Sequence, residues 1–160
     1  MTFQLAASDD KTARPSVSSD TVTLVSCVKS KLPHKAAAKK LYTSAQFRGK
    51  RRFAEATGKR WYVLSALYGL VEPDTTIDPY HRTLKTLPTE QRRMWAQETF
   101  NALMQAEPGL QNVIILAGQR YREFLVPKLL DLGIKVDIPM AYLRQGEQLA
   151  WLAGDHGKAG

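Results

Sequence analysis

The residues best suited to chemistry follow an apolar segment, Trp61 to Ala66, in a polar loop that continues to about Leu87. This loop carries three acids: Glu72, Asp74 and Asp78. A carboxylate can act as a general base on water or stabilise an oxocarbenium-like centre during cleavage of a glycosidic bond. We therefore name Asp78 and Glu72 as candidate catalytic residues. In the alternative interpretation all three are ordinary loop acids, of which Asp74 and Asp78 cap turns beside prolines.

Two tyrosines belong to the same stretch of chain. Tyr68 and Tyr80 can stack on a nucleobase or form a hydrogen bond to a phosphate, although both could instead be core residues whose hydroxyls reach water. Ser65 precedes them at the end of the apolar segment, and Gly69 marks the break into the loop. These four residues are candidate contacts to nucleic acid.

A second polar loop, Ser26-Cys27-Val28-Lys29-Ser30-Lys31, follows the apolar segment Thr21 to Cys27. Ammonium groups and free backbone N–H groups at a strand end suit a phosphate. Lys29 is therefore a third catalytic candidate, and Ser26, Cys27 and Lys31 are candidate phosphate contacts. The loop is not a Walker loop, because GxxxxGK(S/T) is absent. Cys27 could act as a nucleophile, but no His or Asp partner is visible and buried structural thiols are inert.

A third candidate loop follows the apolar segment Asn112 to Ala117 and contains Gly118, Gln119 and Tyr121. Glycine permits close approach of a ligand, and the start of the helix expected here favours an anion. A tight turn that requires glycine explains the same residues equally well. Gln145, near the end of the chain, offers an amide for contacts to base edges or simply begins a helix.

The positive charge is concentrated in one segment. Between Lys29 and Arg60 there are eleven Lys and Arg residues and one acid, Glu55, so this segment carries +10 while the rest of the chain carries −2. Such a concentration favours phosphate-bearing partners, either nucleic acid or a nucleotide. A solvated helix face is the alternative. Four residues of this segment complete the set of candidate nucleic-acid contacts: Tyr42, Ser44, Arg48 and Arg51.

The segments that must position these loops alternate between strand and helix patterns. We expect strands over residues 21–27, 61–66, 112–117 and 134–138, and helices over 36–42, 44–56, 88–106, 119–132 and 145–152, with a long loop from 67 to 87. This alternation predicts an α/β fold: a single three-layer domain with a mostly parallel central sheet flanked by helices. Ligands bind beyond the carboxyl ends of strands in such sheets, where the three polar loops begin.

Helical spacing also predicts which side chains point inward. In the helix over 44–56, Phe47 and Phe53 are expected to face the core. The basic residues of that helix are expected on its outer surface: Arg48, Lys50, Arg51 and Arg52. In the helix over 88–106 the expected core contacts are Trp95, Phe100, Leu103 and Met104.

Length and composition predict one domain over residues 21–153, preceded by a disordered arm over 1–20 and followed by a flexible tail over 154–160. One cysteine and three scattered histidines, His34, His81 and His156, give no metal-ligand spacing, so we expect no metal and no cofactor. No apolar run approaches the roughly 18 residues of a membrane span, and no signal-peptide pattern is present. We expect a cytoplasmic protein with no membrane partner; the oligomeric state stays open.

Three motifs together resemble an uncharacterised bacterial and phage domain family over roughly Thr21 to Leu152. They are Ser26-Cys27-x-Lys29-x-Lys31, Ala38-x-x-Leu41-Tyr42-x-Ser44-x-x-Phe47 and Leu64-Ser65-Ala66-x-Tyr68-Gly69-Leu70-x-x-Pro73. Two of the loops are also similar to those of the YaaA peroxide-stress proteins. The matching residues are Ser26, Lys29, Leu64, Ser65, Leu67, Tyr68, Gly69, Pro73, Pro79 and Tyr80.

The YaaA resemblance is narrower than the first. This chain is much shorter and would lack the additional helical DNA-binding elements of that group, and the loop acids Glu72, Asp74 and Asp78 do not match its pattern. The resemblance implies a DNA-associated α/β protein with a basic cleft, and it implies no reaction.

Three functions are consistent with these observations. The first is an enzyme that cleaves the N-glycosidic bond of a modified or damaged base in DNA, with lysines on phosphate, a tyrosine stacked on the extruded base, and Asp78 or Glu72 positioning water or the sugar. The second is a non-catalytic DNA-recognition module that uses the basic segment to follow the backbone. The third is a hydrolase of small nucleotides or nucleosides.

Overall fold

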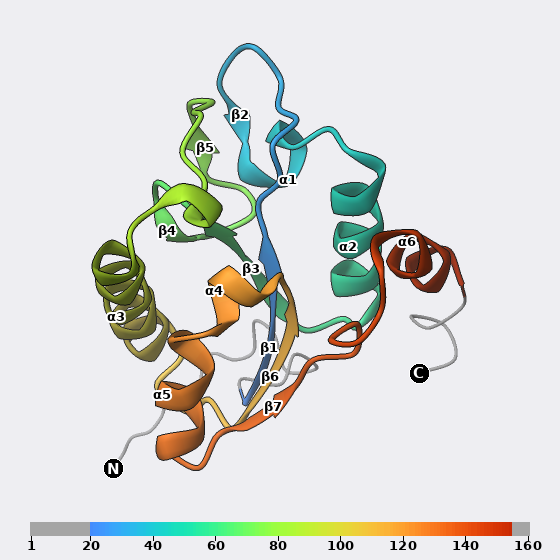
Figure 1. Ribbon diagram of the computed structural model, residues 1–160. Helices are drawn as coiled ribbons and strands as arrows, with labels where there is room; N and C mark the ends of the chain where they lie inside the picture. Colours follow the sequence, from blue (N-terminus) through green and yellow to red (C-terminus); the bar gives the residue numbers. More distant parts are fainter. Residues whose placement is uncertain (1–19, 155–160) are drawn as a thin grey trace, which may run out of the picture.

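The computed structural model describes residues 20–154, and its elements are labelled in Figure 1. The strands are β1 (Thr21–Ser26), β2 (Ala36–Ala37), β3 (Arg60–Ser65), β4 (Gly69–Val71), β5 (Thr76–Ile77), β6 (Asn112–Leu116) and β7 (Lys135–Asp137). The helices are α1 (Ala38–Leu41), α2 (Ala45–Ala56), the 3-10 turn η2 (Leu84–Thr86), α3 (Thr89–Ala106), α4 (Gln119–Arg122), α5 (Leu125–Asp131) and α6 (Gln145–Ala153).

A five-stranded sheet in the order β4-β3-β1-β6-β7 forms the centre of the molecule. Strands β3, β1, β6 and β7 are parallel, and β4 alone is antiparallel to its neighbour. The central strand β1 has the sequence TVTLVS and is buried from Val22 to Ser26, as expected for a strand covered on both faces. The predicted α/β fold with a mostly parallel sheet is therefore confirmed.

Helices cover both faces of this sheet. The chain passes from β1 to β3 through α2, then back past β1 to β6 through α3, so right-handed crossovers place α2 and α3 on opposite faces. Helix α6 packs on α2, and α5 packs on α3. Figure 1 shows the result, with α3 and α5 on one side of the strands and α2 and α6 on the other.

Helix α2 differs from the prediction at one residue. Ser44 caps the helix, since its Oγ accepts a hydrogen bond of 3.1 Å from the Phe47 N–H, and Phe47 is buried as expected. Lys50 is buried as well, so its predicted place on the outer surface was wrong. It lies three residues after Phe47 and four before Ala54, which is the spacing of one helix face. The side-chain type suggested the surface, but the spacing placed Lys50 inside.

The segment from 67 to 87 is more ordered than the predicted loop. Strand β4 turns back along β3 after Gly69, whose φ of +74° lies in the left-handed region that glycine adopts without strain. Strand β5 pairs with β2 in a separate two-stranded sheet, and η2 follows. The prediction missed β4 and β5 because strands of three and two residues are too short to show a periodicity.

The other boundaries agree with the prediction except in two places. The helix expected over 36–42 begins as strand β2 and is helical only from Ala38, and the helix expected over 119–132 is divided into α4 and α5. The expected arm over 1–20 and the expected tail over 154–160 lie outside the described residues, except for Asp20 and Gly154. Within residues 20–154, no helix is both long and apolar enough to cross a membrane. The same residues contain no group of three His, Cys, Asp or Glu side chains that could hold a metal ion.

Candidate functional site

The site lies at the carboxyl end of β1, where the chain leaves toward one side of the sheet and later returns to the other side. Strand β1 lies between β3, reached first along the chain, and β6, reached later, and all three run in the same direction. Their carboxyl ends therefore meet at one edge of the sheet, with β1 in the middle. In open α/β sheets the crevice at such a switch point is the usual ligand site.

A group of polar side chains gathers at this edge, and we call it the carboxyl-edge cluster. Strand β1 and the loop after it contribute Ser26, Cys27 and Lys31, and β3 contributes Ser65. Tyr42 follows α1, Lys50 lies on α2, Tyr80 follows β5 and Tyr121 lies on α4. The cluster has these eight members: Ser26, Cys27, Lys31, Tyr42, Lys50, Ser65, Tyr80 and Tyr121.

Ser65 organises one half of the cluster. Its Oγ donates a hydrogen bond of 2.8 Å to the Tyr80 hydroxyl, which lies 2.6 Å from the Tyr42 hydroxyl. The same oxygen accepts from the backbone N–H groups of Leu67 (3.2 Å) and Tyr68 (2.9 Å). The turn after β3 therefore fixes Ser65, and Ser65 in turn fixes two buried phenols.

Cys27 organises the other half. Its Sγ lies 3.1 Å from the Tyr121 hydroxyl, and the Tyr121 ring packs edge-on against Trp95 at 5.5 Å between centroids. The Trp95 indole N–H donates to the Ser65 carbonyl at 2.8 Å, so Trp95 joins the two halves. Burial raises the pKa of both Tyr80 and Tyr121 far above the ordinary value. Both phenols therefore stay neutral near pH 7 and keep a proton to donate.

Two lysines give the cluster its charge. Lys31 Nζ lies 4.5 Å from the centroid of the Tyr80 ring and donates to the Lys29 carbonyl at 3.1 Å. Lys50 Nζ donates to Ser26 Oγ at 3.1 Å. Burial lowers the pKa of Lys31, and burial together with the nearby charge of Lys85 lowers the pKa of Lys50 to about 8. The cluster contains no carboxylate, so its electrostatics favour an anionic ligand.

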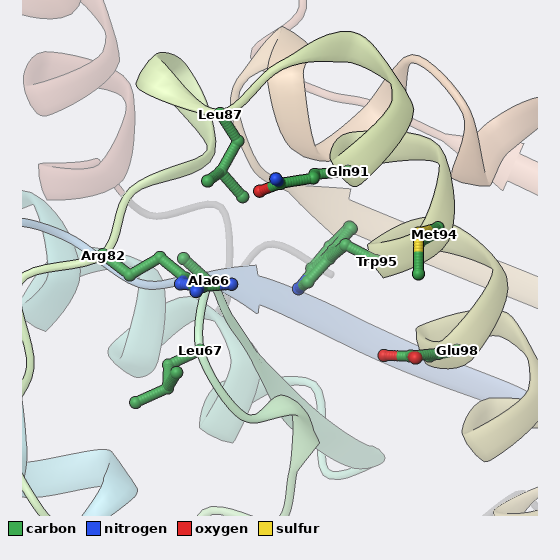
Figure 2. Close-up of a pocket in the computed structure, with 8 residues that line it drawn as sticks. All are labelled: Ala66, Leu67, Arg82, Leu87, Gln91, Met94, Trp95 and Glu98. Atoms are coloured by element: carbon green, nitrogen blue, oxygen red, sulfur yellow. The ribbon is translucent and has the colours of Figure 1, made fainter.

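A pocket of about 430 Å³, which we call the Trp95 pocket, opens beside the cluster. Figure 2 shows Ala66, Leu67 and Arg82 on one side of it and the α3 side chains on the other. Its full lining is Ala66, Leu67, Arg82, Leu87, Gln91, Met94, Trp95 and Glu98. Ala66 and Leu67 directly follow Ser65, and Trp95 contacts both Ser65 and Tyr121, so the pocket and the cluster share a wall.

The three predicted catalytic residues do not meet in the cluster. Asp78 is exposed two residues before Tyr80, and its carbonyl accepts a hydrogen bond of 3.5 Å from the Tyr68 hydroxyl. Glu72 lines a different pocket together with Arg60 and Trp61, at the amino end of β3. Lys29 is exposed, and its carbonyl accepts the bond from Lys31. Asp78 is thus the acid whose chain segment borders the cluster.

The loop acid Asp74 has a structural role. Its carboxylate forms an ion pair of 2.6 Å with Lys39 Nζ. The hydrogen bond and charge of Lys39 lower the pKa of the Asp74 carboxyl, which is exposed to solvent.

The predicted binding residues divide into two groups. Ser26, Cys27, Lys31, Tyr42, Ser65, Tyr80 and Tyr121 belong to the cluster, with Tyr68 and Gly69 on the adjoining turn. The second group serves the fold: Ser44 caps α2, Arg48 donates to the Thr43 carbonyl, and Arg51 pairs with Glu55 at 3.0 Å. Gly118 is the N-cap residue of α4, and Gln119 and Gln145 are exposed at the starts of α4 and α6.

Sequence reasoning missed two parts of the site. Lys50 was assigned to the surface although its helical spacing from Phe47 predicts burial. Trp95 was assigned to the core without a polar role, yet its indole joins β3 to α3 and lines the pocket. Nothing in the local sequence around Trp95 indicates that its N–H meets a carbonyl thirty residues earlier in the chain.

Comparison with known proteins gives one match. A family model described as a family of unknown function (DUF6884) matches residues 22–154, which confirms the expected membership of an uncharacterised family. No curated protein matches the chain, and no solved structure matches it. The expected similarity to the YaaA proteins therefore receives no support from these comparisons.

Proposed function

Because the chain belongs to DUF6884, a family of unknown function, we propose its function from the site: a DNA-associated protein that binds one nucleotide at the carboxyl edge and cleaves the N-glycosidic bond of a modified or damaged base. One observation carries this proposal. An acid-free cluster of lysines and tyrosines lies at the switch point of an α/β sheet and shares a wall with the Trp95 pocket. The cluster suits a phosphate, and the pocket suits a base.

Phosphate binding is supported by the charge around the cluster. The basic segment, residues 29–60, forms the loop after β1 together with α1 and α2, so it adjoins the cluster lysines Lys31 and Lys50. Five of its basic residues are exposed and have no carboxylate partner among residues 20–154: Lys29, Lys35, Lys40, Arg48 and Arg52. Exposed cations of this kind bind the DNA backbone with little dependence on sequence.

The Trp95 pocket supplies what a base requires. Leu67, Met94 and Trp95 offer apolar surface to the faces of a ring. Arg82, Gln91 and Glu98 offer donors and acceptors to its edges, and an amide such as Gln91 can read a base by two hydrogen bonds. Tyr68, 42 % exposed on the adjoining turn, is placed to stack on a base extruded from a duplex.

Asp78 is the carboxylate proposed for the reaction. It lies on the segment that leads to Tyr80, and its backbone accepts the Tyr68 hydroxyl, so this acid borders both cluster and turn. There it would position water or stabilise positive charge on the sugar. Glu72 is not part of this proposal, because it lines the pocket at the other end of β3. The proposal also includes the similarity to the YaaA proteins. Three of the residues that match those proteins, Ser26, Ser65 and Tyr80, belong to the carboxyl-edge cluster.

The test is release of a free base from duplexes that carry plain, damaged or hypermodified bases. We expect the wild type to release base from at least one modified duplex and to leave a heat-labile strand. Asp78→Asn is expected to keep DNA binding and lower base release at least about a hundredfold, the usual contribution of a general base. Asp131→Asn, which changes an exposed acid of α5, is the matched control and should behave as wild type.

Two results would reject the proposal in different ways. Tight binding with no product on any duplex would leave a recognition module. If the protein binds no oligonucleotide but a free nucleotide raises its melting temperature, the remaining interpretation is an enzyme that acts on small nucleotides. The second outcome has an observation in its favour, because Lys50 is too deeply buried to contact a phosphate at the surface.

A further inference from the structure

We propose that Lys50 and Ser26 form a buried subsite for a phosphate monoester, so that the nucleotide bound at the carboxyl edge is the phosphorylated end of a strand or a free monophosphate. This inference rests on the proposed function in taking the ligand to be a nucleotide. It adds the chemical class of that nucleotide, which the carboxyl-edge cluster as a whole does not define.

The positive charge of Lys50 is unbalanced in the interior. Lys50 is 5 % exposed and Ser26 is 3 % exposed, and within residues 20–154 the ammonium group forms no ion pair and a single hydrogen bond, to Ser26 Oγ. An ammonium group has three donors, so two remain for a ligand. Burial of a charge without a partner is expensive, and proteins keep such groups where a ligand completes them.

The groups that face Lys50 add to this unbalanced positive charge. Lys85 of η2 adds a second positive charge, which with burial lowers the pKa of the Lys50 ammonium to about 8. The coulombic interaction with Cys27, after β1, acts in the opposite direction and raises the pKa of Lys50. Helix α6, packed on the same helix, brings the uncharged Leu152 against Gly49 and Gln148 against Gln46. Among residues 20–154, Lys50 thus interacts with a second cation and with no carboxylate, and a bound anion would offset this positive charge.

Depth selects the monoester over the diester. A phosphodiester inside a strand carries a sugar on each side, and both would have to enter with it. A terminal phosphate has one substituent, so only the phosphate itself has to approach the buried ammonium group. It also carries nearly two negative charges at neutral pH, and Lys31 at the same edge can meet the second.

These properties predict a characteristic pH dependence. A phosphate monoester loses its second charge near pH 6, and Lys50 loses its charge near pH 8. Affinity for a monoester should therefore be highest between these values and fall on both sides. A diester has no ionisation near pH 6, so its affinity should not fall there. Binding at pH 8 should also take up about half a proton, because the anion restores full protonation of Lys50.

The experiment is titration calorimetry at pH 5.5, 7 and 8 with inorganic phosphate, a deoxynucleoside 5′-monophosphate and a 3′,5′-cyclic monophosphate. At pH 8 it is repeated in two buffers of different protonation enthalpy, which measures proton uptake on the wild type. Lys50→Met is expected to weaken monophosphate binding at least about tenfold, the loss of one charge-assisted bond. Lys135→Met removes an exposed lysine of β7, outside the basic segment and the cluster, and should bind as wild type.

Equal affinity for the monophosphate and the cyclic diester would overturn the inference, as would absence of proton uptake or a Lys50→Met variant that binds phosphate normally. If the subsite binds a monoester, the affinities for a 5′-phosphorylated and a 5′-hydroxyl oligonucleotide are compared next. Tighter binding of the phosphorylated oligonucleotide would identify a strand end, and equal binding would identify a free nucleotide, as the source of the phosphate. The base-release assay is independent of all these measurements. Phosphate binding without base release would uphold the subsite and reject the reaction, and the converse result would reject only the subsite.

Discussion

Lys50 carries a positive charge into the interior at the end of β1, where Ser26 is its hydrogen-bond partner. At the scale of single residues, this arrangement lowers the stability of the fold and favours the binding of an anion. A buried ion without a counter-ion destabilises the fold, whereas a site that must attract an anion needs that ion in place. The neighbouring phenols of Tyr80 and Tyr121 are uncharged, and burial raises the pKa of each further, so their burial carries no such cost.

Replacement of Lys50 should therefore stabilise the free protein. The pKa of Lys50 is about 8 when folded and 10.5 ordinarily, so between these values the unfolded chain binds more protons and wild-type stability rises with pH. Below pH 8 the destabilisation is complete, roughly 3 kcal/mol at most. Lys50→Met is expected to raise the free energy of unfolding in phosphate-free buffer at pH 7, and the gain should shrink as pH rises toward 10.5.

Urea denaturation at pH 7, 9 and 10 measures this gain. Lys40→Met is the matched control: an exposed lysine in the same segment should change stability by less than about 0.5 kcal/mol, with little dependence on pH. A Lys50→Met variant that is less stable than wild type at pH 7 would mean that the ammonium group already has a stabilising partner.

At the scale of elements, the contact between α2 and α6 depends on a missing side chain. A Cβ built on Gly49 would lie 2.9 Å from Leu152 Cβ, a distance that real side chains avoid. Gly49→Ala should therefore destabilise the protein by about 1–3 kcal/mol, the usual consequence of overpacking, although alanine favours a helix.

Gly146 offers the matched control for this substitution. It lies in α6, and a Cβ there would meet nothing within 4 Å, so Gly146→Ala should stabilise the protein by a few tenths to about 1 kcal/mol through helix propensity. The midpoint of urea denaturation measures both variants. If both alanines stabilise the protein, then α6 can move away from α2, and the close contact is not required for the fold.

Elements also show how far sequence reasoning extends. Strands β1, β3 and β6 were predictable because each contains a largely buried run of apolar or β-branched residues, such as Val113–Leu116. Strand β4 was not, because Gly69-Leu70-Val71 becomes a strand only by pairing with β3. That pairing decides the site, since it turns the chain back along β3 and carries Glu72 away from the cluster. Asp78 and Glu72 look equivalent in the sequence, and the β3–β4 hairpin separates them.

At the scale of the whole molecule, the charge distribution is the main feature that bears on a partner. The formal net charge is +8, yet within the basic segment Lys39, Arg51 and Arg60 pair with acids and Lys50 is buried. The sequence predicted the excess charge, but it could not show which cations are neutralised inside the fold. The exposed and unpaired ones are the residues that a long polyanion can reach.

This division predicts how DNA affinity depends on salt. Each phosphate contact contributes about −0.9 to the slope of log K against log salt concentration, so removing one contact should make the slope shallower by about one. Arg52→Gln and Lys40→Gln are each expected to do so with any duplex sequence. Lys135→Gln removes an exposed charge from β7, outside the basic segment, and should leave the slope unchanged. Fluorescence anisotropy between low and moderate salt measures all three. If Lys135→Gln changes the slope as much as Arg52→Gln does, then DNA affinity depends on the net charge of the protein and not on the exposed cations of α1 and α2.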